Sequence, residues 1–156
     1  MDKFSIILLC IAVSLSTLLI FSMLSSTWFY QIPYIIQFKI NGYTKENAIT
    51  VCSGKNLVKT SLCLNAFVKG VYKYVPTSDI VPLDFDRIIS EGDDCRGWTF
   101  VYQTLFNNLG FKNQKVSIPI KKEDNILYKH AFLIVYDETG WCSLDQKDIN
   151  CFVYKK

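Results

Sequence analysis

One uncharged apolar run near the N-terminus constrains this chain more than any other feature. It extends from Phe4 to Met23, twenty residues in which only Ser, Thr and Cys interrupt the hydrophobic side chains. A helix of about 20 apolar residues spans the ~30 Å hydrocarbon core of a bilayer. Aromatic residues, which favour membrane interfaces, follow at once: Trp28, Phe29, Tyr30 and Tyr34. The run therefore predicts a transmembrane anchor, or an uncleaved signal, at residues 1–27.

Two other interpretations of this run are a cleaved signal peptide and a buried globular helix. A signal peptide has an apolar region of about 7–15 residues followed by an A-x-A-like site, whereas this run is longer and no such site follows it. A globular helix normally keeps a polar side. Lys3 precedes the run and the next basic residue is Lys39, so the positive-inside rule favours a single-pass protein whose bulk lies outside the cytoplasm.

The remainder of the chain has the composition of a folded domain. Of the 156 residues, 50% are hydrophobic and 20% are charged, which excludes general disorder. The net charge is only +3 and the basic residues are scattered, so we do not expect a nucleic-acid partner. We expect a juxtamembrane segment at 28–54 and one domain at 55–156.

The six cysteines fall into three groups. Cys10 lies in the apolar run, Cys95 opens a predicted helix, and four are disulfide candidates: Cys52, Cys63, Cys142 and Cys151. Four cysteines allow three connectivities, of which local pairing (52 with 63, 142 with 151) is the simplest; four ordinary buried thiols are the alternative. Disulfides would agree with an oxidising, extracytoplasmic location. Because no close C-x-x-C pair is present, we expect no zinc or other metal.

Periodicity predicts helices first and strands afterwards. Apolar residues at helical spacing predict a helix over 56–74, ended by Pro76, and another over 95–109, with an aspartate cap before it and Gly110 after it. Residues 42–54 are polar and contain turn residues, and 85–90 predict a short helix or turn. Strands are expected at 113–120, 129–136, 140–144 and 150–154. This order indicates an α+β domain with an antiparallel sheet.

Three separated residues form a candidate reactive cluster. The start of a helix stabilises negative charge, which favours a thiolate at Cys95. His130, the sole histidine, opens one strand, and Asp145 ends the next one. Antiparallel pairing can bring these two together, so the carboxylate can orient the imidazole. The imidazole can then take the thiol proton, and an N–H at the helix start can bind an oxyanion.

Two stretches of the sequence resemble a known family. EGDDCRGWTFVYQTLFNNLGF has an acidic and glycine approach, a cysteine at a helix start, an apolar helix and then Leu-Gly. HAFLIVYDETGWCSLD has His-Ala-aromatic, an apolar strand, Gly-Trp and a final Asp. They resemble the two signatures of the transglutaminase-like, papain-related domain. The likeness covers about Leu57 to Asp145 and includes the helix upstream of the cysteine.

The resemblance implies a transglutaminase-like (papain-like) α+β fold, with the nucleophile helix and other helices packed on a small antiparallel sheet. It implies a triad of Cys95 as nucleophile, His130 as base and acid, and Asp145 as orienting carboxylate, without a cofactor. The family acts on amides, as peptidases, other amidohydrolases or transglutaminases, through a thioester acyl-enzyme. Protein or peptide substrates are therefore expected. The expected extracytoplasmic location would place envelope or cell-wall peptides within reach.

Some features leave other interpretations open. Leu133 and Ile134 stand where the family commonly has an acidic or Asn residue. Trp98, one turn after Cys95, is a candidate substrate-binding residue, and a core position is its alternative. A non-catalytic binding or assembly module tethered to the membrane is the alternative function. A redox protein would instead need a close cysteine pair.

Overall fold

The computed structural model describes residues 13–15, 17, 27–77, 81–121 and 127–154. The predicted membrane span at 4–23 lies outside these residues, apart from the helical positions 13–15 and 17. Within the described part of the chain, no helix combines the length and the apolar character needed to cross a bilayer.

Helices precede strands along the chain, as predicted. The helices are α2 (Thr27–Asn41), α3 (Lys45–Cys52), α4 (Leu57–Val71), α5 (Phe85–Glu91) and α6 (Cys95–Asn108). The strands are β1 (Lys112–Lys121), β2 (Leu127–Asp137), β3 (Gly140–Asp145) and β4 (Asp148–Val153). The predicted α+β class with an antiparallel sheet is confirmed.

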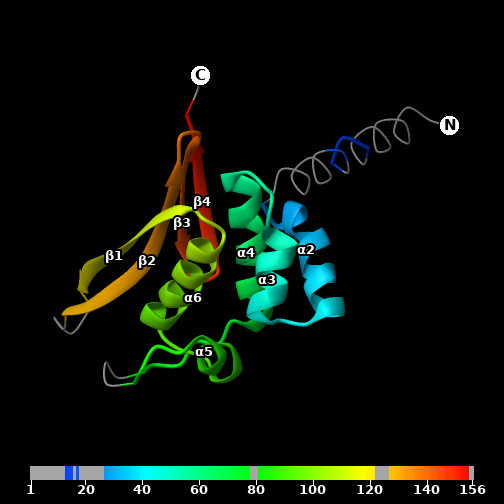
Figure 1. Cartoon of the computed structure of the whole chain (residues 1–156). Helices are drawn as coiled ribbons and strands as arrows, with labels where there is room; N and C mark the ends of the chain where they lie inside the picture. The colour runs from blue at the N-terminus through cyan, green and yellow to red at the C-terminus, as the bar shows by residue number, and fades with distance from the viewer. Residues whose placement is uncertain (1–12, 16, 18–26, 78–80, 122–126, 155–156) are drawn as a thin grey trace, which may run out of the picture.

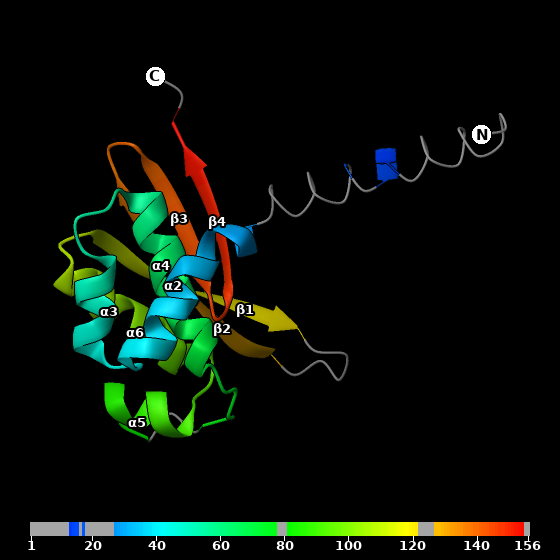
Figure 2. The ribbon, with the colours of Figure 1, turned by 90° about the vertical axis from the view of Figure 1, so that its right-hand side faces the viewer.

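The four strands form one antiparallel sheet in the order β1-β2-β3-β4, so each strand pairs with its neighbour in sequence. All the labelled helices lie on the same side of this sheet (Figures 1 and 2). Helices α4 and α6 lie against the strands, and α2 packs behind α4. The sheet therefore has one face covered by helices and one face uncovered in the described chain.

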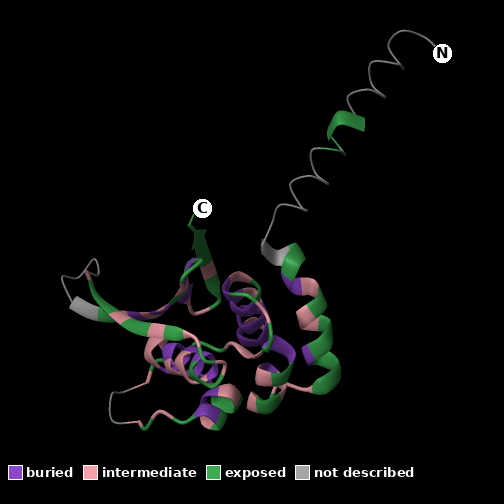
Figure 3. Cartoon of the chain, turned by 45° about the horizontal axis from the view of Figure 1, so that its top comes forward, coloured by how far each residue is buried: buried purple, intermediate pink, exposed green. Residues whose placement is uncertain are grey.

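The core lies between α4, α6 and the covered face of the sheet (Figure 3). Alternate strand residues point to the same face of a sheet, and the buried strand residues follow this rule: Ala131, Leu133 and Val135 on β2, with Cys142 and Leu144 on β3. Opposite them, α6 buries large side chains at helical spacing, namely Trp98, Tyr102, Leu105 and Phe106. This packing fixes α6, and with it Cys95, relative to β2.

Residues 42–54 differ from the sequence prediction. The part predicted as polar turns contains α3, whose N-cap Thr44 accepts a hydrogen bond from the Asn47 N–H at 3.2 Å. Ala48 on α3 and Phe38 on α2 are fully buried in the same core as α4 and α6. The polar composition concealed α3 because only one side of this short helix is apolar. The predicted juxtamembrane segment thus contributes to the core.

Two disulfides link neighbouring elements. Cys52 at the end of α3 is bonded to Cys63 on α4, and Cys142 on β3 is bonded to Cys151 on β4. This is the local pairing, the simplest of the three connectivities that the sequence allows. Each closes a short loop, with sequence separations of 11 and 9 residues.

Candidate active site

Cys95 is the first residue of α6 and the free cysteine of the described chain. Asp94 caps the helix: its carboxylate accepts hydrogen bonds from the N–H groups of Arg96 (2.8 Å) and Gly97 (3.4 Å). Trp98 N–H bonds to the Asp94 carbonyl. The N–H of Cys95 itself has no hydrogen-bond acceptor among the described residues, so it is the first-turn donor that a ligand can use.

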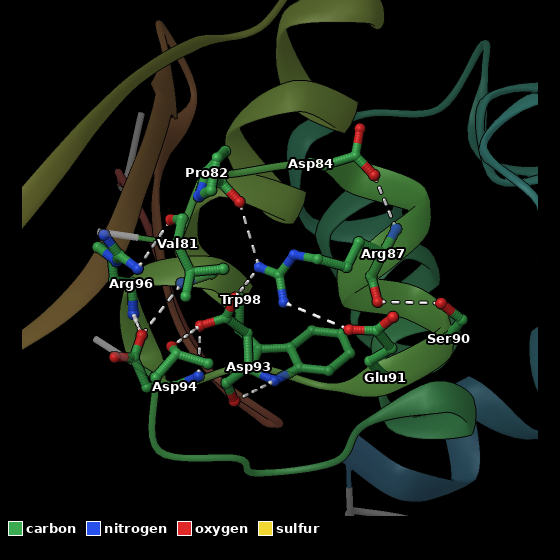
Figure 4. A network of polar contacts seen from close by, with 12 residues as sticks. Val81, Pro82, Asp84, Arg87, Ser90, Glu91, Asp93, Asp94, Arg96 and Trp98 are labelled. Carbon is green, nitrogen blue, oxygen red and sulfur yellow. Dashed lines mark hydrogen bonds and ion pairs between the residues drawn. The ribbon is translucent and has the colours of Figure 1, made fainter. Parts of the chain in front are cut away.

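The approach to α6 is fixed by a buried carboxylate, Asp93 (Figure 4). It accepts hydrogen bonds from the Thr77 hydroxyl, the Arg87 guanidinium and the Asp94 N–H. Burial alone would raise the pKa of Asp93, but these hydrogen bonds and the Arg87 charge outweigh it and lower the pKa. The Asp93 side chain is therefore a charged anchor for the turn that precedes the cysteine.

Glycine at position 97 makes this arrangement possible. A Cβ atom at Gly97 would lie 2.3 Å from Cγ of Asp93, far inside van der Waals contact. The carboxylate thus packs directly on the backbone of the first turn of α6. Gly97 therefore permits the close approach of the Asp93 side chain to the α6 backbone.

The Cys95 sulfur lies against an open edge of β2. Strand β3 pairs with β2 only as far as Leu133↔Leu144, which leaves the preceding residues of β2 without a strand on that side. There the Ala131 N–H donates to Sγ at 3.4 Å, and Sγ donates to the Lys129 carbonyl at 3.8 Å. The sulfur is thus held by the two backbone groups that flank His130.

His130 and Asp145 form the contact that the sequence predicted. Nε2 of His130 lies 2.7 Å from Oδ2 of Asp145, although the two residues are 15 positions apart. An ionised carboxylate only accepts hydrogen bonds, so Nε2 carries the proton in this pair and Nδ1 is the ring nitrogen left to accept one. In the described chain no hydrogen bond joins the Cys95 sulfur to the His130 ring. The sulfur instead contacts the backbone of Lys129 and Ala131.

Polar side chains from three helices hold the turn after Asp145. Gln146 has a positive φ of 52°, and its carbonyl accepts a hydrogen bond from the Tyr102 hydroxyl at 2.7 Å. Asn65 donates to that hydroxyl at 2.8 Å, and Gln31 donates to Asn65 at 2.7 Å. Burial raises the pKa of Tyr102, so the phenol stays protonated and remains a donor. This series of hydrogen bonds, from Gln31 through Asn65 and Tyr102 to Gln146, thus positions the residue next to Asp145.

Sequence reasoning missed this chain of hydrogen bonds. Its members are single polar residues inside apolar helices, and no spacing links them. The signal that was available is the polarity of Asn65 itself: it lies in the middle of an apolar helical pattern, and a buried amide must find partners.

A pocket of about 410 Å³ opens beside the sulfur. Its walls come from the start of α6 and from the facing residues of β1 and β2: Asp94, Cys95, Arg96, Lys115, Ser117, Lys129 and Ala131. Neither His130 nor Asp145 is among these described lining residues, since they alternate on β2 and β3 with the buried positions that face the helices. The pocket and the His130 side chain therefore lie on opposite faces of β2, and the sulfur contacts the backbone of that strand on both sides of His130.

Trp98 lies in the core, which is the alternative to its prediction as a substrate-binding residue. Its side chain is fully buried, and its indole N–H donates to the carbonyls of Lys73 and Asp93, each at 3.0 Å. It does not line the pocket formed by the described residues. Its contribution to the site is to fasten the chain before α5 to the start of α6.

Comparison of the sequence with protein-family models gives no match, and comparison with curated proteins gives none either.

Proposed function

We propose that this chain is a membrane-anchored cysteine hydrolase or acyltransferase of transglutaminase-like type, acting on peptide or side-chain amides. The observation that carries the proposal is the His130–Asp145 contact at 2.7 Å beside a sulfur held by the backbone on both sides of His130. The resemblance of the two signature stretches supports the same assignment. Cys95, His130 and Asp145 are the proposed triad.

The proposed reaction begins with proton transfer from the Cys95 thiol to Nδ1 of His130. The thiolate attacks the amide carbonyl carbon, and the carbonyl oxygen becomes an oxyanion that the Cys95 N–H can bind. Collapse breaks the C–N bond, and the leaving amine takes the proton from His130. Water or a second amine then attacks the thioester, which gives hydrolysis or transfer. Asp145 holds the ring and stabilises its charged form.

We propose an extracytoplasmic location for the domain. Two disulfides are present, and disulfides persist mainly in oxidising compartments. The apolar run at 4–23 would tether the domain to the membrane as a single-pass protein. Proteins or peptides of the envelope or the cell wall would then be within reach as substrates.

The proposal is tested by labelling and turnover in detergent with the full chain. We expect iodoacetamide to label Cys95 at pH 6.5, read by peptide mass mapping so that Cys10 is counted separately. We expect His130→Ala to slow labelling and to abolish amide cleavage or amine transfer on a peptide mixture, since general-base catalysis contributes about 10²–10⁴-fold in rate. Asp145→Ala should also slow both reactions.

The matched control is Asp148→Ala, because Asp148 is an exposed aspartate at the other end of the same turn. It should label and react as the unmodified chain does. Labelling equal to that of N-acetylcysteine and unaffected by His130→Ala would contradict the proposal and favour the non-catalytic tethered module.

A further inference from the structure

The pocket beside Cys95 is strongly basic. Three of its lining residues are cations, Arg96, Lys115 and Lys129, and one is a carboxylate, Asp94. The whole chain carries a net charge of only +3, so positive charge is concentrated at this pocket. A concave site lined by charge of one sign attracts ligands of the opposite sign.

The two lysines are the charges that remain exposed to a ligand. Asp94 already accepts the N–H groups of Arg96 and Gly97, which places its negative charge against the start of α6. The Arg96 guanidinium contacts the Val81 carbonyl at 3.4 Å (Figure 4). Lys115 and Lys129, by contrast, are exposed side chains at the pocket wall.

The strand register gives the pocket a small floor between the two lysines. Ser117 pairs with Ala131, Pro119 with Lys129, and Lys115 with Leu133. These residues share the face of the sheet that meets α6. The short side chains of Ser117 and Ala131 therefore form the floor, with one lysine at each end. The Ala131 N–H contacts the sulfur at 3.4 Å, so the floor adjoins the nucleophile.

We propose that this pocket selects peptide substrates that carry a carboxylate side chain next to the reacting amide. The inference rests on the proposed function, because it names the substrate class of the same site. A glutamate or aspartate side chain over Ser117 and Ala131 lies between two ammonium groups, each of which can form a charge-assisted hydrogen bond with it. The adjoining amide carbonyl then lies at the sulfur.

A pair of alkylating reagents tests the charge preference without requiring turnover. Iodoacetate and iodoacetamide have similar size and differ in negative charge. We compare the rate with iodoacetate divided by the rate with iodoacetamide, in the full chain in detergent at low salt. We expect this ratio at Cys95 to exceed the ratio for N-acetylcysteine by about tenfold, the lower end of electrostatic focusing. The excess should shrink at high salt, which screens exposed charges.

Two double variants separate the pocket from general charge. Lys115→Glu with Lys129→Glu should bring the ratio to or below that of N-acetylcysteine. Lys112→Glu with Lys59→Glu makes the same charge change at exposed lysines outside the pocket, and it should leave the ratio unchanged. A ratio equal to that of N-acetylcysteine, or equal effects of the two variants, would overturn the inference.

Peptide protection then tests the ligand class. A glutamate-containing peptide should slow iodoacetamide labelling of Cys95, and its glutamine counterpart should protect less. Equal protection by the two peptides, or equal protection by inorganic phosphate, would contradict recognition of an acidic peptide. The outcomes distinguish the two proposals. A protein that shows no turnover but prefers the anionic reagent would contradict only the proposed enzymatic activity. A protein that turns over substrate without any charge preference would contradict only this inference.

Discussion

At the scale of single residues, Asp93 has a larger structural role than its position in the sequence indicates. The sequence pattern favours a helix cap at Asp93 or Asp94, and only Asp94 caps α6. Asp93 is fully buried and paired with Arg87, which lies six residues before it. A buried carboxylate of this kind is costly to leave unpaired, so the pair fixes α5 against the start of α6.

We predict that Asp93→Asn destabilises the fold by about 3 kcal/mol, the lower end for breaking a buried ion pair. The lowered pKa of Asp93 adds a pH dependence. The unfolded chain binds this proton more readily, so the stabilisation is complete above the ordinary pKa of about 3.9 and is lost as the pH falls through the folded pKa. Urea denaturation from pH 7 to pH 3 measures this, and Asp93→Asn should lose less stability on acidification.

Glu91→Gln is the control for this prediction. Glu91 faces the same arginine at 4.0 Å but is 69% exposed, and exposed ion pairs contribute about 0–1 kcal/mol. An equal loss of stability in Glu91→Gln and Asp93→Asn would show that burial of the carboxylate does not matter.

At the scale of elements, a line of hydrogen bonds connects α2, α4 and α6 to the turn between β3 and β4. Tyr102 is its central member, since it accepts from Asn65 and donates to the Gln146 carbonyl. The Tyr72 hydroxyl also donates to the side chain of Gln146. The helices thereby determine where the turn that follows Asp145 can lie.

We predict that Tyr102→Phe lowers the free energy of unfolding by about 1–3 kcal/mol, because it leaves buried polar groups without a partner. It should also reduce the effect of Asp145→Ala on the labelling rate of Cys95, since a displaced Asp145 orients His130 less well. Tyr136→Phe removes a hydroxyl from a 40% exposed tyrosine and should change neither quantity. A purely structural role for Tyr102 would alter stability and leave the labelling dependence intact.

The elements that the sequence predicted are those with strong local signals. Helix α6 has an aspartate cap and Gly110 after it, and the strands have alternating or continuous apolar residues between turn residues. His130 and Asp145 could be paired because one tight turn joins their strands. Helix α3 and the buried positions of Arg87 and Asp93 could not be predicted, because they depend on contacts between segments that no local pattern connects.

At the scale of the whole molecule, the proposed anchor and the folded domain meet at the start of α2. Helix α2 begins at Thr27 and reaches the core through the fully buried Phe38. A cut after Ser26 therefore leaves every labelled helix and strand intact.

We predict that removing residues 1–26 yields a protein that stays in the aqueous phase of a detergent partition, with a thermal midpoint within a few degrees of the full chain. The reason is that, among the residues that the structure describes, the core begins in α2. Retention of the truncated protein in the detergent phase would contradict the anchor, and a large drop in the midpoint would show that residues before α2 support the core. The full chain in the same partition is the reference.

The placement of the two disulfides has a consequence for how the cluster of Cys95, His130 and Asp145 comes apart on unfolding. One bridge lies within the helices and the other within the sheet, so no covalent link among the described residues joins the two halves. The sulfur belongs to α6, whereas the imidazole and its carboxylate belong to β2 and β3. Heat or denaturant can therefore separate the Cys95 sulfur from the imidazole and its carboxylate while both bridges persist.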